Sequence, residues 1–292
     1  MIQSNFLKNY VGLSQKSTYL LIFLLVRNIL LPAQTLRRSL ADSYTGPGAY
    51  SLHHADVFSF TSNPAALAQL KNSSFAFYGE RRFLLKELNN YTAVIGLPVH
   101  SGNFGMEARY AGFSDYNEMQ LGIAYGRTLG TKVDIGVQFN YQGIRINGYG
   151  TASAISVEAG AVLHLTDRLH TGFHINNPVG GKFGKGQQEK IASVYTFGLG
   201  YDASEKFFFS AEIEKEEGSL VTVNAGFQYK FIAQLLVRAG MSSATTTAWI
   251  GAGLILKSFR IDLTTRYHPV LGITPGLLLL FNLPQATSKT QL

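Results

Sequence analysis

The sequence contains no cysteine, few charges and, beyond residue 33, no long apolar run. Without cysteine the chain has no disulfide, no thiolate nucleophile and no cysteine-ligated zinc. Asp, Glu, Lys and Arg make up 15% of the 292 residues, whereas soluble domains average roughly 25%. A membrane-spanning helix needs about 18 consecutive apolar residues, and no later stretch approaches that length. Two classes remain: a soluble all-β protein, or a β-barrel whose apolar face meets lipid.

Part of the formal net charge of +7 comes from the N-terminal residues. Residues 1–33 contain Lys8, Lys16 and Arg27 and no acidic residue, so the rest of the chain has 22 basic and 18 acidic groups. These later charges form no basic stripe. Because nucleic-acid binding leaves such an electrostatic footprint, we expect no nucleic-acid partner.

The first 33 residues predict a secretory signal peptide. Lys8 and Lys16 precede the apolar run 19–26, which has the length of a signal core, and Ala33 offers a small residue at the cleavage point. Cleavage there leaves a mature chain of 259 residues. The alternative is an uncleaved anchor helix, but Arg27 inside the apolar stretch disfavours it, because a charge near the bilayer centre is costly.

From residue 73 onward the hydrophobic pattern has a period of two. In residues 132–142 every odd position is apolar and every even position is polar or Gly, and residues 219–231 and 259–268 follow similar patterns. Successive side chains of a strand point to opposite faces, so each segment predicts a strand with one oily and one wet face. We expect about fourteen: 73–80, 91–98, 102–111, 117–127, 131–144, 152–165, 168–176, 190–202, 205–215, 219–231, 234–241, 247–256, 259–266 and 274–283.

The connections between these segments differ in length. Those after even-numbered segments are tight, whereas most of those after odd-numbered ones are longer, as at 81–90, 112–116, 145–151, 177–189, 242–246 and 267–273. Transmembrane barrels have short periplasmic turns, longer outer loops and an even strand number. The sequence therefore predicts an all-β fold, a transmembrane antiparallel β-barrel over residues 73–283, in the outer membrane and surrounded by its lipid. Both termini are then periplasmic, and residues 284–292 form a tail.

The wet faces of the predicted strands carry charges of both signs. A selectivity filter for ions would be more one-sided, so we expect a paired network that braces the wall and an internal segment. Its predicted members are Glu107, Arg109, Asp134, Glu158, Arg168, Lys206, Glu212, Lys230, Arg238, Arg260, Asp262 and Arg266.

Metal and enzyme sites are not indicated. His170 and His174 share a strand face but lie about 13 Å apart, too far for one ion. His164 approaches His170 across a turn, yet no carboxylate or third imidazole completes a set nearby in the sequence. The glycine- and lysine-rich segment 181–186 lacks the spacing of a phosphate-binding loop and predicts an outer loop. We expect no cofactor and no catalytic site.

Residues 34–72 differ in texture from the strands that follow. Asn63 and Pro64 suit the cap and first position of a helical turn that continues through Ala65. So short a segment cannot bury a core of its own, and fourteen strands enclose more space than their side chains fill. We therefore expect residues 34–72 to fold into the lumen as a plug.

The segment from Asp56 to Asn63-Pro-Ala-Ala-Leu-Ala68 resembles the motif that precedes the first strand in the FadL superfamily. The chain is more closely similar to the PorV/PorQ-type proteins of Bacteroidota, which residues 78–88 and 267–272 also resemble. The resemblance implies a fourteen-strand barrel with a luminal plug whose motif residues are Asp56, Asn63, Pro64 and Ala65, and no enzymatic activity.

The same resemblance leaves two functions open. PorV relatives are parts of the type IX secretion apparatus and help hand over cargo at the cell surface, which makes secretion proteins the partners. FadL relatives passively admit hydrophobic molecules through a lateral opening in the wall. A purely structural barrel is a third alternative. The outer loops of this chain are shorter than those of either group. The inward charges, such as Glu107 and Arg260, favour a braced interior and hence the secretion hypothesis.

Overall fold

The computed structural model describes residues 40–184, 189–244 and 246–283. The chain divides into two units, residues 1–33 and 34–292, and the fold described here belongs to the second. The predicted signal peptide and the predicted tail 284–292 lie outside the described residues.

Fourteen strands form one closed antiparallel barrel, as the alternation predicts. Most predicted segments differ from the observed strands by only one or two residues at each end. The barrel strands are β1 (Ser74–Arg81), β2 (Asn89–Val99), β3 (Gly102–Gly112), β4 (Tyr116–Leu129), β5 (Val133–Ile146), β6 (Gly150–His164), β7 (Leu169–Asn176), β10 (Val194–Asp202), β11 (Phe207–Glu216), β12 (Val221–Ile232), β13 (Leu235–Ser242), β14 (Thr247–Leu256), β15 (Phe259–His268) and β16 (Gly272–Asn282).

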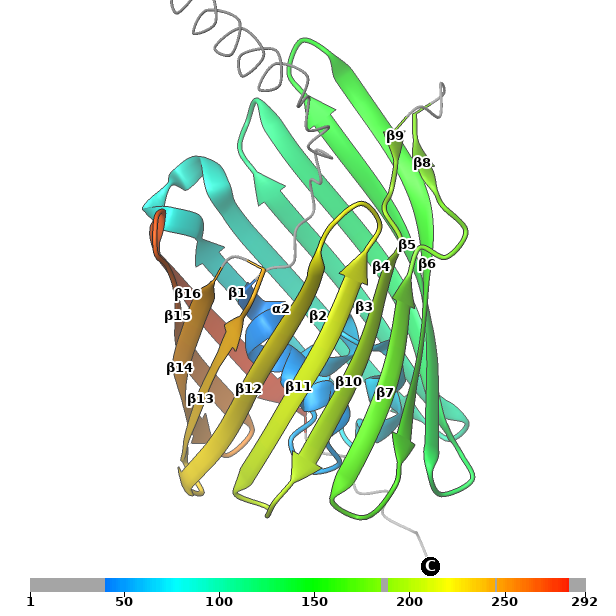
Figure 1. Cartoon of the computed structure of the whole chain (residues 1–292), viewed down its shortest axis with the longest axis vertical. Coiled ribbons are helices and arrows are strands. Elements are labelled where there is room, and N and C mark those ends of the chain that lie inside the picture. The colour runs from blue at the N-terminus through cyan, green and yellow to red at the C-terminus, as the bar shows by residue number, and fades with distance from the viewer. Residues whose placement is uncertain (1–39, 185–188, 245, 284–292) are drawn as a thin grey trace, which may run out of the picture. The chain divides into compact units, whose positions relative to one another are not determined.

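Each barrel strand pairs with its neighbours in sequence, and β1 pairs with β16 to close the ring (Figure 1). A separate two-stranded sheet, β8 (Lys182–Phe183) and β9 (Glu189–Lys190), lies in the long connection between β7 and β10. Closure matters because lipid cannot satisfy free backbone N–H and C=O groups, so a spanning sheet must have no open edge.

The lengths of the connections differ less between the two ends of the barrel than the sequence predicts. At the end where β1 begins and β16 ends, called the turn end below, connections have two to four residues. At the opposite loop end, only residues 82–88 and 177–193 exceed four. The longer loops predicted at 112–116, 145–151, 242–246 and 267–273 are wrong, because pairing continues past the amphipathic segments, for example between Ile146 and Gly150.

The two faces of the wall have opposite chemistry. On β5, Phe139 points outward and is 58% exposed, whereas the neighbouring Gln138 points inward and is 1% exposed. Outward apolar side chains such as Ile123, Ile155 and Leu263 are likewise exposed all around the barrel. The outside is thus an apolar belt, and most of the buried inward side chains of the wall are polar.

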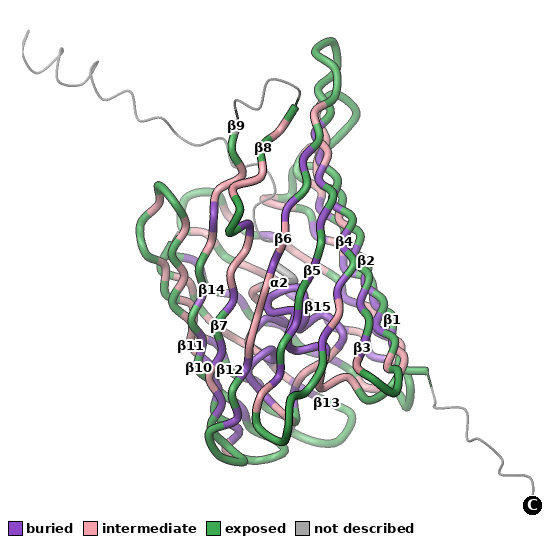
Figure 2. Tube along the Cα trace, turned by 90° about the vertical axis from the view of Figure 1, so that its right-hand side faces the viewer, coloured by how far each residue is buried: buried purple, intermediate pink, exposed green. Residues whose placement is uncertain are grey.

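A plug of short helices lies inside the barrel (Figure 2). It consists of α2 (Leu40–Thr45), η1 (Gly46–Tyr50), η2 (Val57–Thr61) and η3 (Pro64–Gln69); two further turns, η4 (Arg82–Leu84) and η5 (Lys86–Leu88), lie in the connection after β1. The plug contacts β1 to β7 and β10 to β14. No helix in the described part of the chain is long and apolar enough to cross a membrane.

Candidate functional site

The helical turns of the plug begin at polar caps that the sequence places there. The Asp56 carboxylate accepts a hydrogen bond from the Phe58 backbone N–H at 2.9 Å, and the Ser59 hydroxyl accepts one from the Asp56 N–H at 3.0 Å. The Asn63 side chain accepts from the Ala65 N–H at 3.0 Å, and Pro64 occupies the first helical position. Caps of this kind satisfy backbone donors that a short helix leaves open.

Asp56 also binds the wall. Its second carboxylate oxygen accepts from Arg260 at 2.8 Å and from Arg238 at 3.2 Å, and the Arg260 Nε lies 3.1 Å from the Asp262 carboxylate. Burial alone would raise the pKa of the Asp56 carboxyl, but the two guanidinium groups outweigh burial and lower this pKa. Two buried arginines and two buried carboxylates thus form a balanced cluster between β13, β15 and the plug.

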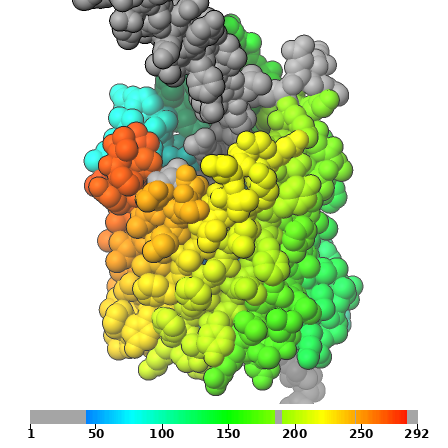
Figure 3. Space-filling model, in the orientation of Figure 1, coloured from blue at the N-terminus to red at the C-terminus, as the bar shows by residue number. Residues whose placement is uncertain are grey.

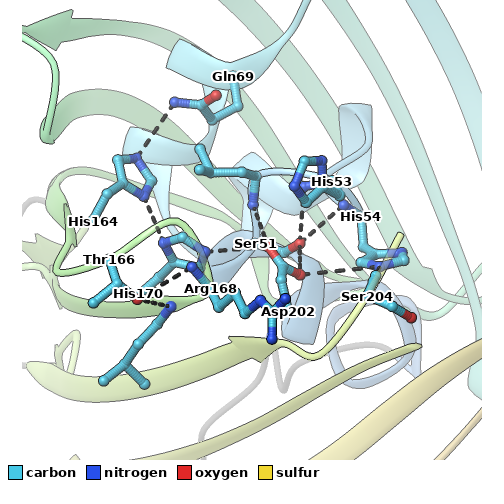
Figure 4. A network of polar contacts seen from close by, with 12 residues as sticks. Ser51, His53, His54, Gln69, His164, Thr166, Arg168, His170, Asp202 and Ser204 are labelled. Atoms are coloured by element: carbon cyan, nitrogen blue, oxygen red, sulfur yellow. Dashed lines mark hydrogen bonds and ion pairs between the residues drawn. The ribbon is translucent and has the colours of Figure 1, made fainter. Parts of the chain in front are cut away.

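A second polar chain crosses four neighbouring strands of the wall, and Figure 4 shows its part from His164 through His170 to Asp202. Asp134 on β5 lies 2.9 Å from His164 Nε2, the Nδ1 atoms of His164 and His170 lie 2.9 Å apart, and His170 Nε2 lies 3.1 Å from Asp202 on β10. The sequence places no carboxylate close to these histidines in the chain, and the two that reach them come from distant strands. The pairing of strands that are far apart in the sequence brings Asp134 to the His164 ring and Asp202 to the His170 ring.

Each Nε2 faces a carboxylate oxygen and the two Nδ1 atoms face each other, so the histidine pair is in polar contact at both ends and across its centre.

The plug binds both ends of this chain. Gln69 donates to the Asp134 carboxylate at 2.5 Å, while the Ser51 hydroxyl and the Leu52 N–H donate to Asp202 at 2.6 and 3.0 Å. His54 of the plug lies 2.6 Å from the Gln228 amide, and Gln228 in turn accepts from Arg238. The histidine chain and the arginine cluster are thereby joined into one belt from β5 to β15, called the polar belt below.

The plug also sits in close recesses of the wall. A methyl group at Gly136 would lie 2.3 Å from the backbone carbonyl carbon of Pro64, and one at Gly200 would lie 1.9 Å from the carbonyl oxygen of Tyr50. The Asn103 Nδ2 atom on β3 lies within hydrogen-bond distance of three backbone carbonyls at the end of η3, among them that of Leu70 at 2.9 Å, and its two N–H groups are shared between them. Glycine is therefore required where the backbone of the plug touches the wall.

The remaining predicted network residues lie nearer the loop end. Glu158 accepts from Asn140 at 2.7 Å and pairs with His174 at 2.8 Å. The other contacts are Arg109 with Glu107, Gln138 with Glu107 at 2.9 Å, Asn224 with Glu212 at 2.9 Å, and Arg266 with Ser43 of the plug at 2.9 Å.

Three predicted members of the network behave differently. Arg168 and Lys206 lie exposed in the tight turns before β7 and before β11, so their side chains are not part of the luminal network. The sequence pattern extends the alternation of inward and outward side chains to these two residues. In the structure, that alternation stops where the chain leaves the sheet. Lys230 is half-buried near the end of β12.

Among the described residues, no group of three or more His, Cys, Asp or Glu side chains could hold a metal ion.

The other side of the plug packs through apolar side chains. The plug contributes Tyr44, Val57, Phe58, Phe60, Leu67 and Leu70, and the wall contributes Ala76, Tyr78, Val94, Ala124, Trp249, Leu278 and Leu280. These residues of β1, β2, β4, β14 and β16 form the apolar seam. The plug is thus held both by the polar belt and by these nonpolar contacts, a combination that the sequence pattern did not reveal.

A closed barrel of fourteen antiparallel strands with an N-terminal luminal plug is the fold of the FadL-like outer-membrane barrels. The structure is similar to the toluene transporter TodX of Pseudomonas putida, with a TM-score of 0.60 and 11% identity over 78% of this chain and 94% of that one. For the toluene transporter TbuX of Ralstonia pickettii the values are 0.58, 10%, 82% and 95%. For a FadL homologue of Pseudomonas aeruginosa they are 0.51, 12%, 85% and 97%.

No family model and no curated protein matches the sequence. At identities near 11%, the likeness to solved structures establishes the fold alone. The fourteen-strand barrel fold that the resemblance to the FadL superfamily implies is confirmed. Its PorV/PorQ part is not, since none of these three structures is named for protein secretion.

Proposed function

We propose that this protein is a passive outer-membrane channel for small hydrophobic or amphipathic molecules, without catalytic activity. The apolar seam carries the proposal. It lines one side of the plug with buried nonpolar side chains, while the polar belt fixes the other side. A hydrophobic molecule moving along the seam replaces one nonpolar contact by another, whereas a polar solute loses its hydrogen bonds to water.

The fold supports the same proposal. The similar solved structures include proteins named as toluene transporters and as a monoaromatic hydrocarbon channel. Monoaromatic hydrocarbons are therefore suitable first probes. Because the plug contacts most of the wall, a molecule can pass only if the plug moves where it packs against the seam. In our proposal its bonds to the polar belt stay in place during this movement.

The wall supports our proposal that the protein lies in the outer membrane. The belt of exposed apolar side chains matches a lipid environment, and the space-filling view shows the side chains of β10 to β14 packed side by side on one face (Figure 3). Strands β1 and β16 begin and end at the turn end. In our proposal this end faces the periplasm, with both termini, since barrels of this kind keep short turns on that side.

The test compares two buried valines of the wall. Val94 belongs to the apolar seam and is 1% exposed, whereas Val162 packs against Tyr50 and Ala65 outside it and is 2% exposed. Val94→Thr adds a hydroxyl to the route at nearly constant volume, at a cost of about 1–3 kcal/mol for an unpaired polar group. We expect uptake of radiolabelled toluene by complemented cells to fall at least about fivefold for V94T and to stay near wild type for V162T. Equal uptake by both variants would rule out the seam as the route.

A role in type IX secretion or surface assembly is the second candidate. It has support in the sequence resemblance and in one observation: nonpolar side chains stand exposed at the tips of four loop-end connections. They are Tyr149 (91%), Leu220 (90%), Val270 (85%) and Val179 (75%). Such tips suit contact with another protein. Replacing all four by Ser should impair cargo release at the cell surface if this candidate holds and leave it unchanged if the channel is the whole function.

A further inference from the structure

At one place of the loop end, a connection takes over the position of a wall strand. Strand β1 stops at Arg81, so residues 272–275 of β16 have no strand on that side within the described chain. The connection 82–88 packs there instead, since η4 contacts β16 and the Phe83 N–H donates to the Thr274 hydroxyl at 3.2 Å. Figure 3 shows the cyan atoms of this part of the chain beside the orange-red atoms of the turn between β15 and β16. Residues 82–88 are called the leucine segment below.

The leucine segment holds three leucines outward on a strained backbone. Phe83 and Leu84 have φ +53° and +62°, the left-handed region. A β-carbon crowds the neighbouring carbonyl there, so two consecutive residues other than glycine cost free energy. Leu84, Leu85 and Leu88 are nevertheless 57%, 51% and 41% exposed. Exposing leucines to water gives no return for this strain, whereas contact with nonpolar surroundings does.

The strand register places the leucine segment next to the apolar belt. Gly79, Tyr91 and Tyr110 occupy one level of β1, β2 and β3, and both tyrosines are exposed on the outer face. Outward tyrosines near strand ends mark the level of the lipid headgroups. Arg81, the last residue of β1, is two residues beyond Gly79. The leucine segment therefore begins at the headgroup level, directly beyond the Phe77 ring that stacks on Tyr91.

Cationic side chains accompany these leucines. Lys86 is exposed within the segment and Arg81 is exposed where it begins, while Arg82 pairs with Glu80 at 2.8 Å. Glu87 is the one acidic residue of the segment. Segments that lie in a membrane surface combine leucines with lysine or arginine, because the nonpolar groups enter the acyl region and the cations stay among the headgroups.

We propose that the leucine segment binds the lipid leaflet at the loop end, with Leu84, Leu85 and Leu88 among the acyl chains and Lys86 at lipid phosphate groups. Lipid is the occupant because the segment continues the apolar belt at the level of the outward tyrosines. The proposal rests on the membrane location proposed above but not on the channel. A barrel that transports nothing would still make this contact.

The test is spin labelling of single-cysteine variants, each of which carries one label because the chain has no cysteine. The purified full chain is placed in vesicles of phosphatidylcholine and phosphatidylglycerol with a nitroxide on Leu85→Cys. Collisions of the label with oxygen, which concentrates in the bilayer, are compared with its collisions with a water-soluble nickel chelate. Leu263→Cys in the apolar belt is the lipid reference, and Leu220→Cys between β11 and β12 at the loop end is the water reference.

We expect the ratio of oxygen to nickel collisions at position 85 to be close to that at 263 and at least about threefold above that at 220. A ratio equal to that at 220 would place the leucine segment in water. A label shielded from both reagents would place it against protein. Either result would overturn the proposal. A water-like ratio at position 263 would instead contradict the membrane location itself, so the two failures are distinguishable.

Lys86→Gln tests the headgroup contact with the label at position 85. Adding phosphatidylglycerol to phosphatidylcholine vesicles should raise the ratio of oxygen to nickel collisions while Lys86 is present, because the anionic headgroup draws the segment inward. Lys86→Gln should lose this response. Lys215→Gln is the matched control, since Lys215 is an exposed lysine near the loop end of β11, and it should keep the response. An equal response in both variants would refute the contact between Lys86 and lipid.

Discussion

Replacing Asp56 by Asn tests the link between the plug and the wall. The amide retains an oxygen that can cap the Phe58 N–H, but it loses the negative charge that faces Arg238 and Arg260. Breaking a buried ion pair by removing one partner costs about 3–5 kcal/mol. Because Asp262 still faces Arg260, we expect the lower end of that range, about 3 kcal/mol.

This loss concerns the seating of the plug rather than the barrel, whose strands keep their hydrogen bonds. Hydrogen–deuterium exchange with mass spectrometry reads it directly, since local opening sets the exchange of plug amides. A loss of about 3 kcal/mol accelerates exchange in residues 57–69 roughly a hundredfold, and peptides from β3 to β5 should exchange as in the wild type.

Glu217→Gln is the control for this substitution. Glu217 pairs with Lys190 at 2.7 Å, but both side chains are about half exposed, so solvent screens the pair and the same chemical change should have little effect on stability. Plug exchange in D56N that equals that in E217Q would refute the reasoning, because the buried cluster would then contribute nothing to holding the plug.

Three further predictions concern other parts of the plug interface. Gly200→Ala places a methyl group against the Tyr50 backbone, so the variant should fold as a barrel yet show proteolytic cleavage within the plug that the wild type resists. Burial, and then the charge of Lys230, lower the pKa of His54 to about 4. An undocked ring takes up a proton near pH 6.5 and the docked ring does not, so protection of the plug amides should weaken as pH falls from 6.5 to 4. A His54→Gln variant should lack this pH dependence. Nitrogen-15 spectra of labelled histidine should show a hydrogen bond between the Nδ1 atoms of His164 and His170, and two rings without that coupling would contradict the contact.

The strands were predictable because each one repeats a simple local signal. Lipid outside and polar groups inside impose a two-residue period, and that period is visible in any single strand, such as residues 132–142. The short plug was predictable in outline, since Asn63 and Pro64 mark a helical turn and the segment has no core of its own.

The polar belt was not predictable, because it depends on register between distant strands. Asp134, His164 and Asp202 come together only when β5, β6, β7 and β10 pair as they do. The inward glycines Gly136 and Gly200 were the available signal for plug contact, since glycine within a strand often marks close approach of another backbone. Arg168 was predicted to face the lumen but is exposed in a turn. A period of two predicts which face a residue takes within a strand, but it carries no information on where the strand ends.

The most direct test of the channel is a deletion strain compared with the wild type for two properties. One is uptake of radiolabelled toluene by intact cells, and the other is surface delivery of cargo that carries a C-terminal secretion signal. The apolar seam predicts that uptake falls severalfold, that delivery is unchanged, and that the intact gene restores uptake whereas V94T does not. Unchanged uptake with lost delivery would contradict the channel.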